Sequence, residues 1–225
     1  MRDPFVAWLA ALSLIAIAYV AWLGRAPHRD LERFERAHVS IQEGDLVFQD
    51  LACGPRCDLI RELTGSRYVH VGIVFGEGDA RAVWEAFGPV GPTELASWRT
   101  RGVDGQIAVY RPWGAPRRAL RRVRAELEMM RGRSYDPDYQ WDDERIYCSE
   151  LVAKAFAAAM GRTLWEPGPV DLAGHGALVA RMSGGRLTSE TPLVTPRALT
   201  EHPHFERVWD PLRVSDGGVA SATMP

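Results

Sequence analysis

The chain has 225 residues, 46% of them hydrophobic and eight of them tryptophan, which is enough for one well-packed domain plus an appendage. A formal net charge of −2 gives no basis for nucleic-acid binding, and three cysteines are too few for a disulfide-rich scaffold. Lys154 is the only lysine, so clusters of arginine reflect composition and are discounted as evidence of a binding surface.

The first segment with a clear pattern is residues 5–23, which contain no charged side chain. Nineteen residues of helix are about 28 Å long, close to the roughly 30 Å hydrocarbon core of a bilayer. Tyr19 and Trp22 stand toward its far end, where interfacial aromatic residues are common. We expect residues 1–25 to be an uncleaved transmembrane anchor, with a cleaved signal peptide as the alternative, and residues 26–40 to be a charged linker.

Two features give conflicting evidence on topology. Arg2 precedes the apolar segment and Arg25, Arg29, Arg33 and Arg36 follow it, a distribution that favours a cytoplasmic domain. Cys53 and Cys57, in contrast, flank a three-residue loop that can close as a disulfide in an oxidising compartment. Two unpaired thiols are the alternative. We expect a single-pass membrane protein whose main domain is periplasmic or otherwise extracytoplasmic.

A strand predicted over residues 66–75 alternates in character. Its odd-numbered positions from 69 to 73 are apolar and share the face that we expect to form the core. The other face carries Tyr68, His70 and Gly72, which supply a phenol, an imidazole and room for a neighbouring group.

A turn separates this strand from another at residues 82–86. If the hairpin is symmetric about Glu77 and Gly78, Glu85 lies directly opposite His70 on the same face. A slip of one residue would turn Glu85 away, and an ordinary solvent-facing strand residue is the alternative interpretation.

The remaining pattern predicts a strand at 46–48, a short helix at 60–63, a strand at 106–110, an amphipathic helix at 116–131, short strands near 187–193 and 207–209, and a disordered tail at 214–225. The arginines at positions 117, 118, 121, 122 and 124 of the amphipathic helix are interpreted as a solvated face, with a surface for acidic lipid headgroups as the alternative.

The most informative segment is Ile146–Val152, because it opens a helix with a cysteine. Apolar residues follow Cys148 at helical spacing until Gly161. A cysteine in the first turn lies among amide groups without intrahelical partners and at the positive end of the helix dipole, which stabilises the reactive thiolate. A small buried hydrophobic residue is the alternative interpretation of Cys148.

Cys148, His70 and Glu85 together have the chemistry of a nucleophile, a base and a residue that orients the base. The backbone amide of Cys148 would face the developing oxyanion, and Tyr68 and Ser149 are the other candidates for contact with substrate or oxyanion. No second ligand pair has a spacing that matches Cys53 and Cys57, so a zinc site is not expected there. We predict neither a metal nor an organic cofactor.

Three segments resemble signatures of the NlpC-type papain-like cysteine hydrolases: 44–48 (G-D-L-V-F), 70–74 (H-V-G-I-V) and 147–152 (Y-C-S-E-L-V). In most of that family the cysteine helix precedes the histidine strand, whereas here it follows. The chain therefore resembles the circularly permuted branch, the YiiX/YaeF-like amidases, and residues 134–136 (S-Y-D) add to the match. The resemblance extends over about residues 41–160, with a weaker match at 165–209.

The resemblance implies a papain-like α+β domain over residues 41–213, an antiparallel sheet with the cysteine helix packed on it. It also implies catalytic roles for Cys148, His70 and Glu85. We expect a membrane-anchored cysteine hydrolase that cleaves an amide bond, in a cell-wall peptide for example, through a thioester acyl-enzyme. One alternative is a thiol acyltransferase or lipase acting on lipid acyl groups, as in similar proteins of the lecithin:retinol acyltransferase type. A second alternative is a catalytically silent binding module.

Overall fold

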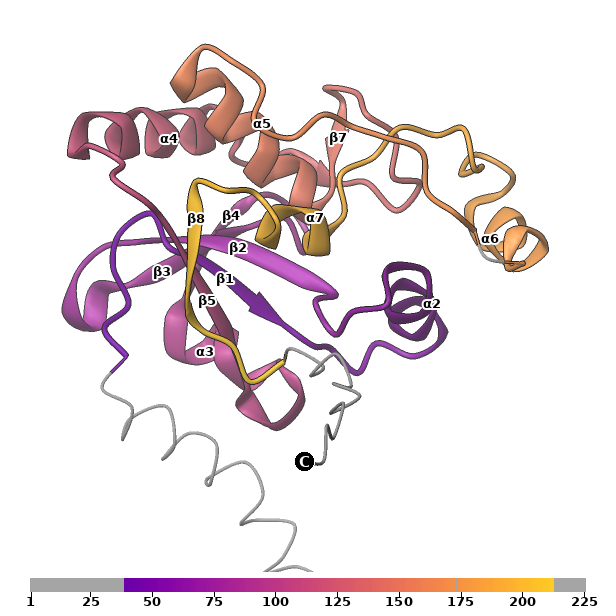
Figure 1. Cartoon of the computed structure of the whole chain (residues 1–225), viewed down its shortest axis with the longest axis horizontal. Helices are drawn as coiled ribbons and strands as arrows, with labels where there is room; N and C mark the ends of the chain where they lie inside the picture. Colours follow the sequence, from indigo (N-terminus) through magenta and orange to yellow (C-terminus); the bar gives the residue numbers. More distant parts are fainter. Residues whose placement is uncertain (1–38, 173, 213–225) are drawn as a thin grey trace, which may run out of the picture.

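The computed structural model describes residues 39–172 and 174–212, and a six-stranded antiparallel sheet organises them (Figure 1). The strands are β1 (Leu46–Gln49), β2 (His70–Phe75), β3 (Ala82–Glu85), β4 (Gly91–Glu94), β5 (Ala108–Pro112) and β8 (Phe205–Trp209), in the order β4-β3-β2-β1-β5-β8. The helices are α2 (Pro55–Thr64), α3 (Leu95–Thr100), α4 (Arg117–Met130), α5 (Cys148–Met160), α6 (Gly176–Ser183) and α7 (Pro196–Thr200), with short 3₁₀ turns η1 (Gly78–Ala80) and η2 (Val103–Gly105). Strands β6 (Ser134–Tyr135) and β7 (Arg145–Ile146) pair in parallel beside the start of α5.

Helices cover both faces of the sheet (Figure 1). On one face, Val71 and Ile73 of β2 share a core cluster with residues of α4 and α5, Leu151 among them. On the other face, Val74 packs in a second cluster with Trp98 of α3. The expected α+β architecture, with the cysteine helix packed on an antiparallel sheet, is confirmed. The core is larger than expected, because the face of β2 predicted to be polar is buried as well.

Helix α5 begins and ends where the sequence predicts. The backbone N–H of Tyr147 donates to the Glu150 carboxylate at 3.2 Å, which satisfies a donor just before the first turn. Gly161 ends the helix in the left-handed conformation, with φ of 68°. Leu151 and Phe156 are fully buried against the sheet, and burying each such side chain contributes about 1.5–3 kcal/mol.

The register of the β2–β3 hairpin differs from the prediction by two residues. Ile73 pairs with Trp84, so Glu85 lies level with Gly72 rather than with His70. The reason is that η1 occupies part of the connection and moves the centre of the turn. Because a shift of two keeps side chains on the same face, Glu85 still shares a face with His70. A Cβ atom at Gly72 would lie 2.3 Å from Val83 Cγ1, so only glycine fits between the strands here.

Residues 66–69 do not continue β2 as predicted. The Ser66 hydroxyl accepts a hydrogen bond from the backbone N–H of Tyr68 at 3.0 Å, which forms a local turn in place of strand. The Tyr68 ring consequently packs in the α5-side core against Phe48, with ring centroids 5.3 Å apart. The prediction that Tyr68 shares a face with His70 is wrong for this reason.

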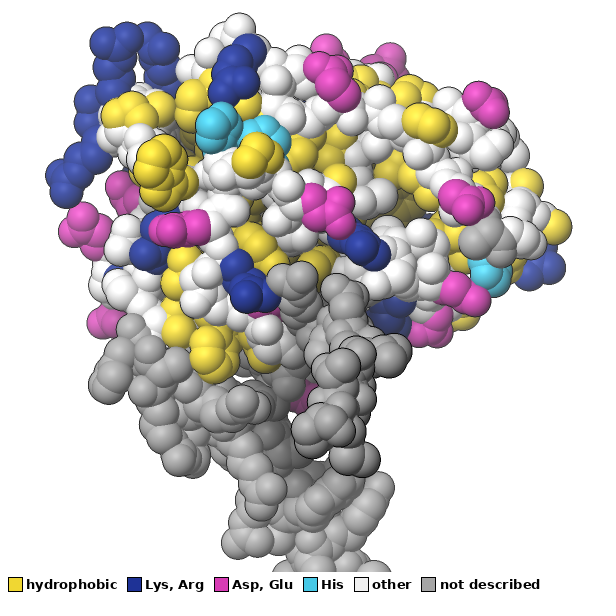
Figure 2. Space-filling model, in the orientation of Figure 1, with side chains coloured by type: hydrophobic (Ala, Val, Ile, Leu, Met, Phe, Trp, Pro, Cys, Tyr) yellow, Lys and Arg dark blue, Asp and Glu magenta, His cyan; other side chains and the backbone are white. Residues whose placement is uncertain are grey.

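Other boundaries differ in smaller ways. The predicted helix at 60–63 is part of the longer α2, and the predicted strand at 187–193 forms an isolated bridge at Leu193 together with local turns. Figure 2 shows basic and acidic side chains interspersed on the face that it presents, in keeping with the small net charge.

The predicted anchor (1–25), nearly all of the linker (26–40) and the predicted tail (214–225) lie outside the described residues. None of the helices in the part that the structure describes has the length and apolar content needed to cross a bilayer.

Candidate active site

Cys148 lies at the first position of α5, where the helix meets the beginning of β2. Its side chain is buried, and it is the cysteine of the described chain that takes no part in a disulfide. A hydrogen bond links its sulfur to the imidazole of His70, the first residue of β2. Two residues that are far apart in sequence are thus joined because α5 packs along β2.

The second nitrogen of the imidazole binds a carboxylate. His70 Nε2 lies 2.6 Å from Glu85 Oε2, and both side chains are almost completely buried. A carboxylate only accepts, so Nε2 donates and the other ring nitrogen, Nδ1, is left for the thiol. Burial lowers the pKa of His70, but its hydrogen bonds to Cys148 and Glu85 outweigh burial and raise the pKa from 6.5 to about 9.

Glu85 is held by three further donors. Thr93 Oγ1 donates to Glu85 Oε1 at 2.6 Å and Trp98 Nε1 donates to Oε2 at 2.8 Å. Arg101 Nη2 also donates to Oε1, at 2.5 Å. Burial raises the pKa of the Glu85 carboxyl, but hydrogen bonds from His70, Thr93 and Arg101 outweigh it and hold the pKa below its usual value. Glu85 therefore stays ionised and favours a charged imidazolium.

Aromatic rings restrict the His70 ring. The Phe87 ring centroid lies 5.4 Å from the imidazole and that of Trp98 lies 6.0 Å away. The Arg101 guanidinium in turn stacks 4.3 Å from the centroid of the Phe87 ring. These contacts, together with the bond to Glu85, fix the orientation of the imidazole toward Cys148.

The sulfur faces a narrow apolar cavity of about 90 Å³ at the start of α5. Helices α2 and α6 and the segment before α7 form its walls, and the lining is almost entirely apolar, with Leu59, Ile60, Leu63, Val179, Met182 and Leu193 among the lining residues. A thiol that lines an apolar cavity is placed to meet an apolar group bound there.

The known proteins that the chain resembles are consistent with this geometry. A model of permuted papain-like amidases, the YaeF/YiiX, C92 family, matches residues 40–209. The chain belongs to this amidase family. It is 28% identical over 173 residues to the uncharacterized protein YiiX of Escherichia coli strain K12, an alignment that covers 74% of this chain and 85% of YiiX. A crystal structure of the metalloprotein YiiX from Escherichia coli O157:H7 superposes with a TM-score of 0.68 at 28% identity, covering 74% of this chain and 95% of the other.

In this family member, the hydroxyls of two predicted site residues form hydrogen bonds elsewhere in the fold. The Tyr68 hydroxyl donates to Asp210 and lies 3.3 Å from the Tyr110 hydroxyl, at a separate, polar cavity. The hydroxyl of Ser149 is near the sulfur in sequence but donates to the backbone oxygen of Val194 at 2.7 Å. Both hydroxyls therefore donate to other groups of the protein, and neither is proposed as an oxyanion donor.

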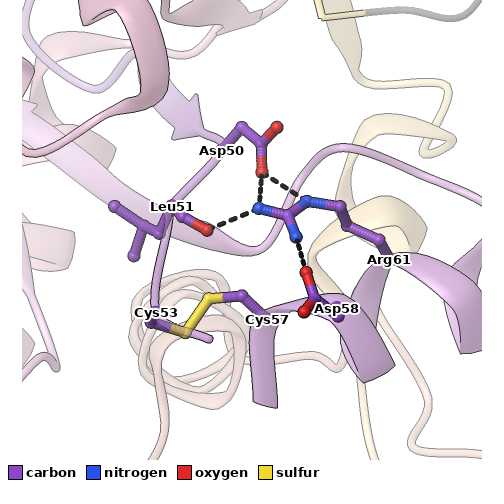
Figure 3. The surroundings of a disulfide bond; sticks show 6 residues. All are labelled: Asp50, Leu51, Cys53, Cys57, Asp58 and Arg61. Carbon is purple, nitrogen blue, oxygen red and sulfur yellow. Dashed lines mark hydrogen bonds and ion pairs between the residues drawn. A yellow bond between two sulfur atoms is a disulfide. The ribbon is translucent and has the colours of Figure 1, made fainter. Parts of the chain in front are cut away.

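The structure joins Cys53 and Cys57 in a disulfide at the start of α2 (Figure 3). Beside it, the Arg61 guanidinium donates to Asp50 at 2.7 Å, to the backbone oxygen of Leu51 at 2.5 Å and to Asp58 at 2.6 Å. These contacts attach α2 to the end of β1. One wall of the cavity at Cys148 is thus held by a disulfide and by charge-assisted hydrogen bonds.

The sequence reasoning missed the donors around Glu85. Trp98 and Arg101 lie three residues apart at the end of α3, a spacing that places two side chains on one face of a helix. That spacing was a usable signal, although only the tertiary fold shows that this face meets Glu85.

Proposed function

We propose that this protein is a cysteine hydrolase that cleaves an amide bond adjoining an apolar acyl group, with Cys148 as nucleophile, His70 as general base and acid, and Glu85 as the residue that orients His70. The observation that carries the proposal is the buried chain of hydrogen bonds from Cys148 through His70 to Glu85, placed at the end of the apolar cavity. Family membership supports a hydrolase of this class.

In the proposed reaction the Cys148 thiolate attacks the carbonyl carbon, and its proton resides on His70. The carbonyl oxygen becomes negative near the unpaired backbone amides at the start of α5. His70 then gives its proton to the leaving amine, and a thioester remains on Cys148. Water, deprotonated by His70, cleaves the thioester, releases the acid and restores the thiol.

The relative described as a metalloprotein makes a metal worth testing against these residues. Among the residues that the structure describes, no group of three His, Cys, Asp or Glu side chains is arranged to hold a metal ion. The Glu85 oxygens accept from His70, Thr93, Trp98 and Arg101, so they are already used. The residues that the structure describes do not fit a metal site, and the proposed reaction has no step through one.

The size of the cavity favours a short acyl group. An apolar cavity of roughly 150 Å³ holds benzene, so the cavity of about 90 Å³ takes a smaller group such as a short alkyl chain. A charged cell-wall peptide fits this apolar lining poorly at its acyl side. Lipid acyl groups are the second candidate, favoured by the same lining, but a long chain requires the cavity to widen.

A series of N-acyl p-nitroanilides tests both candidates. From acetyl to butanoyl, kcat/KM should rise roughly tenfold, because each buried methylene contributes about 0.8 kcal/mol. From butanoyl to dodecanoyl it should fall as the cavity fills. Acid quenching should trap the butanoyl thioester, detected by mass on Cys148, and Cys148→Ala should form none. A rate that keeps rising to dodecanoyl would favour the lipid candidate, and turnover unaffected by Cys148→Ala would exclude the thiol mechanism.

We further propose that residues 1–25 anchor the protein and that the domain is extracytoplasmic, since disulfides such as Cys53–Cys57 persist in oxidising compartments. In a Cys148→Ala, Cys57→Ser double variant, the exposed Cys53 is the only thiol left. A membrane-impermeant maleimide should label it in spheroplasts before lysis. Labelling only after lysis would place the domain in the cytoplasm, as the arginines of the linker suggest.

A further inference from the structure

The loop between β6 and β7 holds Tyr139 in an unusual conformation. Its φ of 56° lies in the left-handed region, and Asp104 is the only other non-glycine residue of the described chain with positive φ. A bulky side chain rarely adopts this conformation, because its Cβ then crowds the backbone. Residues held in such strain occur often at functional sites, where the surrounding structure fixes them.

Asp136 is what fixes this loop. Its fully buried carboxylate accepts hydrogen bonds from the backbone N–H groups on either side of Tyr139, that of Asp138 at 3.0 Å and that of Gln140 at 2.5 Å. Arg145 then pairs with both acids, at 3.2 Å to Asp136 and 2.9 Å to Asp138. The backbone around Tyr139 is thus clamped from both sides, and its left-handed turn is imposed by these contacts.

The clamp directs Tyr139 to the cavity that contains Cys148. Tyr139 lines this cavity together with Cys148, and its ring packs 5.4 Å from that of Tyr147. The Tyr139 hydroxyl is buried and makes no hydrogen bond of standard geometry. A weaker hydrogen-bond interaction with the neighbouring Tyr135 hydroxyl lowers the pKa of Tyr139. A buried hydroxyl that is poorly bonded is costly in the free protein and becomes better satisfied when a ligand supplies an acceptor.

The charges around Tyr139 indicate that it is near the sulfur and protonated. Burial raises the pKa of Tyr139, the interaction with Tyr135 lowers it, and the charge of Cys148 raises it further, for a net rise above the usual value. The phenol therefore keeps its proton at neutral pH and is available as a donor close to Cys148.

We propose that the Tyr139 hydroxyl donates a hydrogen bond to the carbonyl oxygen of the bound acyl group, and that this bond strengthens as the oxygen becomes negative. This inference rests on the proposed function and gives Tyr139 the role that the sequence suggested for Tyr68. The backbone amide of Cys148 is the other donor, and the loop clamped by Asp136 holds the phenol in place before substrate binds.

Three phenylalanine variants test the proposal: Tyr139→Phe, Tyr135→Phe and Tyr110→Phe as the matched control. Each is measured by kcat and KM on butanoyl p-nitroanilide, by the rate of Cys148 alkylation with iodoacetamide, by the affinity for butanal, and by the urea midpoint of unfolding. Butanal forms a hemithioacetal whose oxygen occupies the oxyanion position, whereas iodoacetamide reports only the thiolate.

For Tyr139→Phe we expect kcat to fall about 100-fold, the loss typical of one oxyanion donor, with KM unchanged within about twofold. Butanal affinity should fall in parallel, and iodoacetamide alkylation should keep the wild-type rate. The urea midpoint should change little, because the lost hydroxyl makes no hydrogen bond of standard geometry. Tyr110→Phe, which loses a bond to Asp210, should lower the urea midpoint and leave kcat unchanged.

Three results would overturn the role of Tyr139. Wild-type kcat and butanal affinity in Tyr139→Phe would remove it as a donor, while alkylation and turnover by the wild type would leave the proposed function intact. A large loss in Tyr135→Phe alone would assign the donor to Tyr135. Alkylation that slows with kcat would show that Tyr139 acts on the thiolate. A wild-type protein that neither turns over the anilide nor binds butanal would contradict the proposed function and this inference together.

Discussion

Replacing His70 with alanine is expected to lower kcat/KM for butanoyl p-nitroanilide by about 10³–10⁴-fold, the upper range for loss of a general acid–base. The imidazole both holds the thiol proton and returns it to the leaving amine, so one substitution removes both steps. Alkylation of Cys148 by iodoacetamide at neutral pH should slow as well, because the charged partner of the thiolate is gone. His204→Ala, at an exposed histidine, is the matched control and should retain wild-type rates.

The pH dependence of kcat/KM tests the role of His70 independently of the substitution. Because the pKa of His70 is raised from 6.5 to about 9, the imidazolium persists through neutral pH and is lost only as pH rises through about 9. Acylation needs that proton for the leaving amine, so kcat/KM should fall on the alkaline side near the same pH. A fall centred near 6.5 would mean that Cys148 and Glu85 do not stabilise the charged ring. An unchanged rate in His70→Ala would remove His70 from the mechanism.

Local sequence patterns predicted the helices and strands, but not all of the contacts and pairings between them. The apolar spacing after Cys148 and the stop at Gly161 located α5 well, since both signals act within a few residues. The Cys148–His70 contact depends on how α5 packs along β2, so no local pattern showed it. It was proposed from the chemistry of the two residues and supported by the family resemblance. The hairpin register was wrong by two residues because the 3₁₀ turn has no clear signal in the sequence, yet the face of Glu85 was right.

The positions that the sequence could not locate depend on tertiary contacts. Tyr68 looked like a partner of His70 while residues 66–75 were interpreted as one strand, and the Ser66 turn invalidated that interpretation. Tyr139 gave no signal, because tyrosine seldom adopts positive φ and only the buried Asp136 carboxylate imposes it here. The apolar cavity likewise arises from α2 and α6, which are far apart along the chain.

Glu85→Ala is expected to lower the free energy of unfolding by about 3–5 kcal/mol, the usual cost of removing one partner from a buried ion pair. The substitution leaves donors of four side chains without their shared acceptor: His70, Thr93, Trp98 and Arg101. Urea unfolding measures the effect. Glu94→Ala is the matched control, since Glu94 lies on the adjacent strand but is exposed and accepts a hydrogen bond from the Ser97 hydroxyl of α3. Its cost should stay below about 1 kcal/mol.

Glu85→Gln separates the charge from the packing. The amide keeps the shape of the carboxylate, so the free energy of unfolding should fall less than in the alanine variant. The amide NH₂ group, however, is a hydrogen-bond donor placed among other donors. Loss of the negative charge lowers the pKa of His70, because the imidazolium loses the carboxylate that favours it. The alkaline fall in kcat/KM should therefore move below about 9 in this variant, toward the ordinary value of 6.5. A profile identical to the wild type would show that Glu85 supports the fold without setting the charge of His70, and the orienting role proposed for Glu85 would have to be withdrawn.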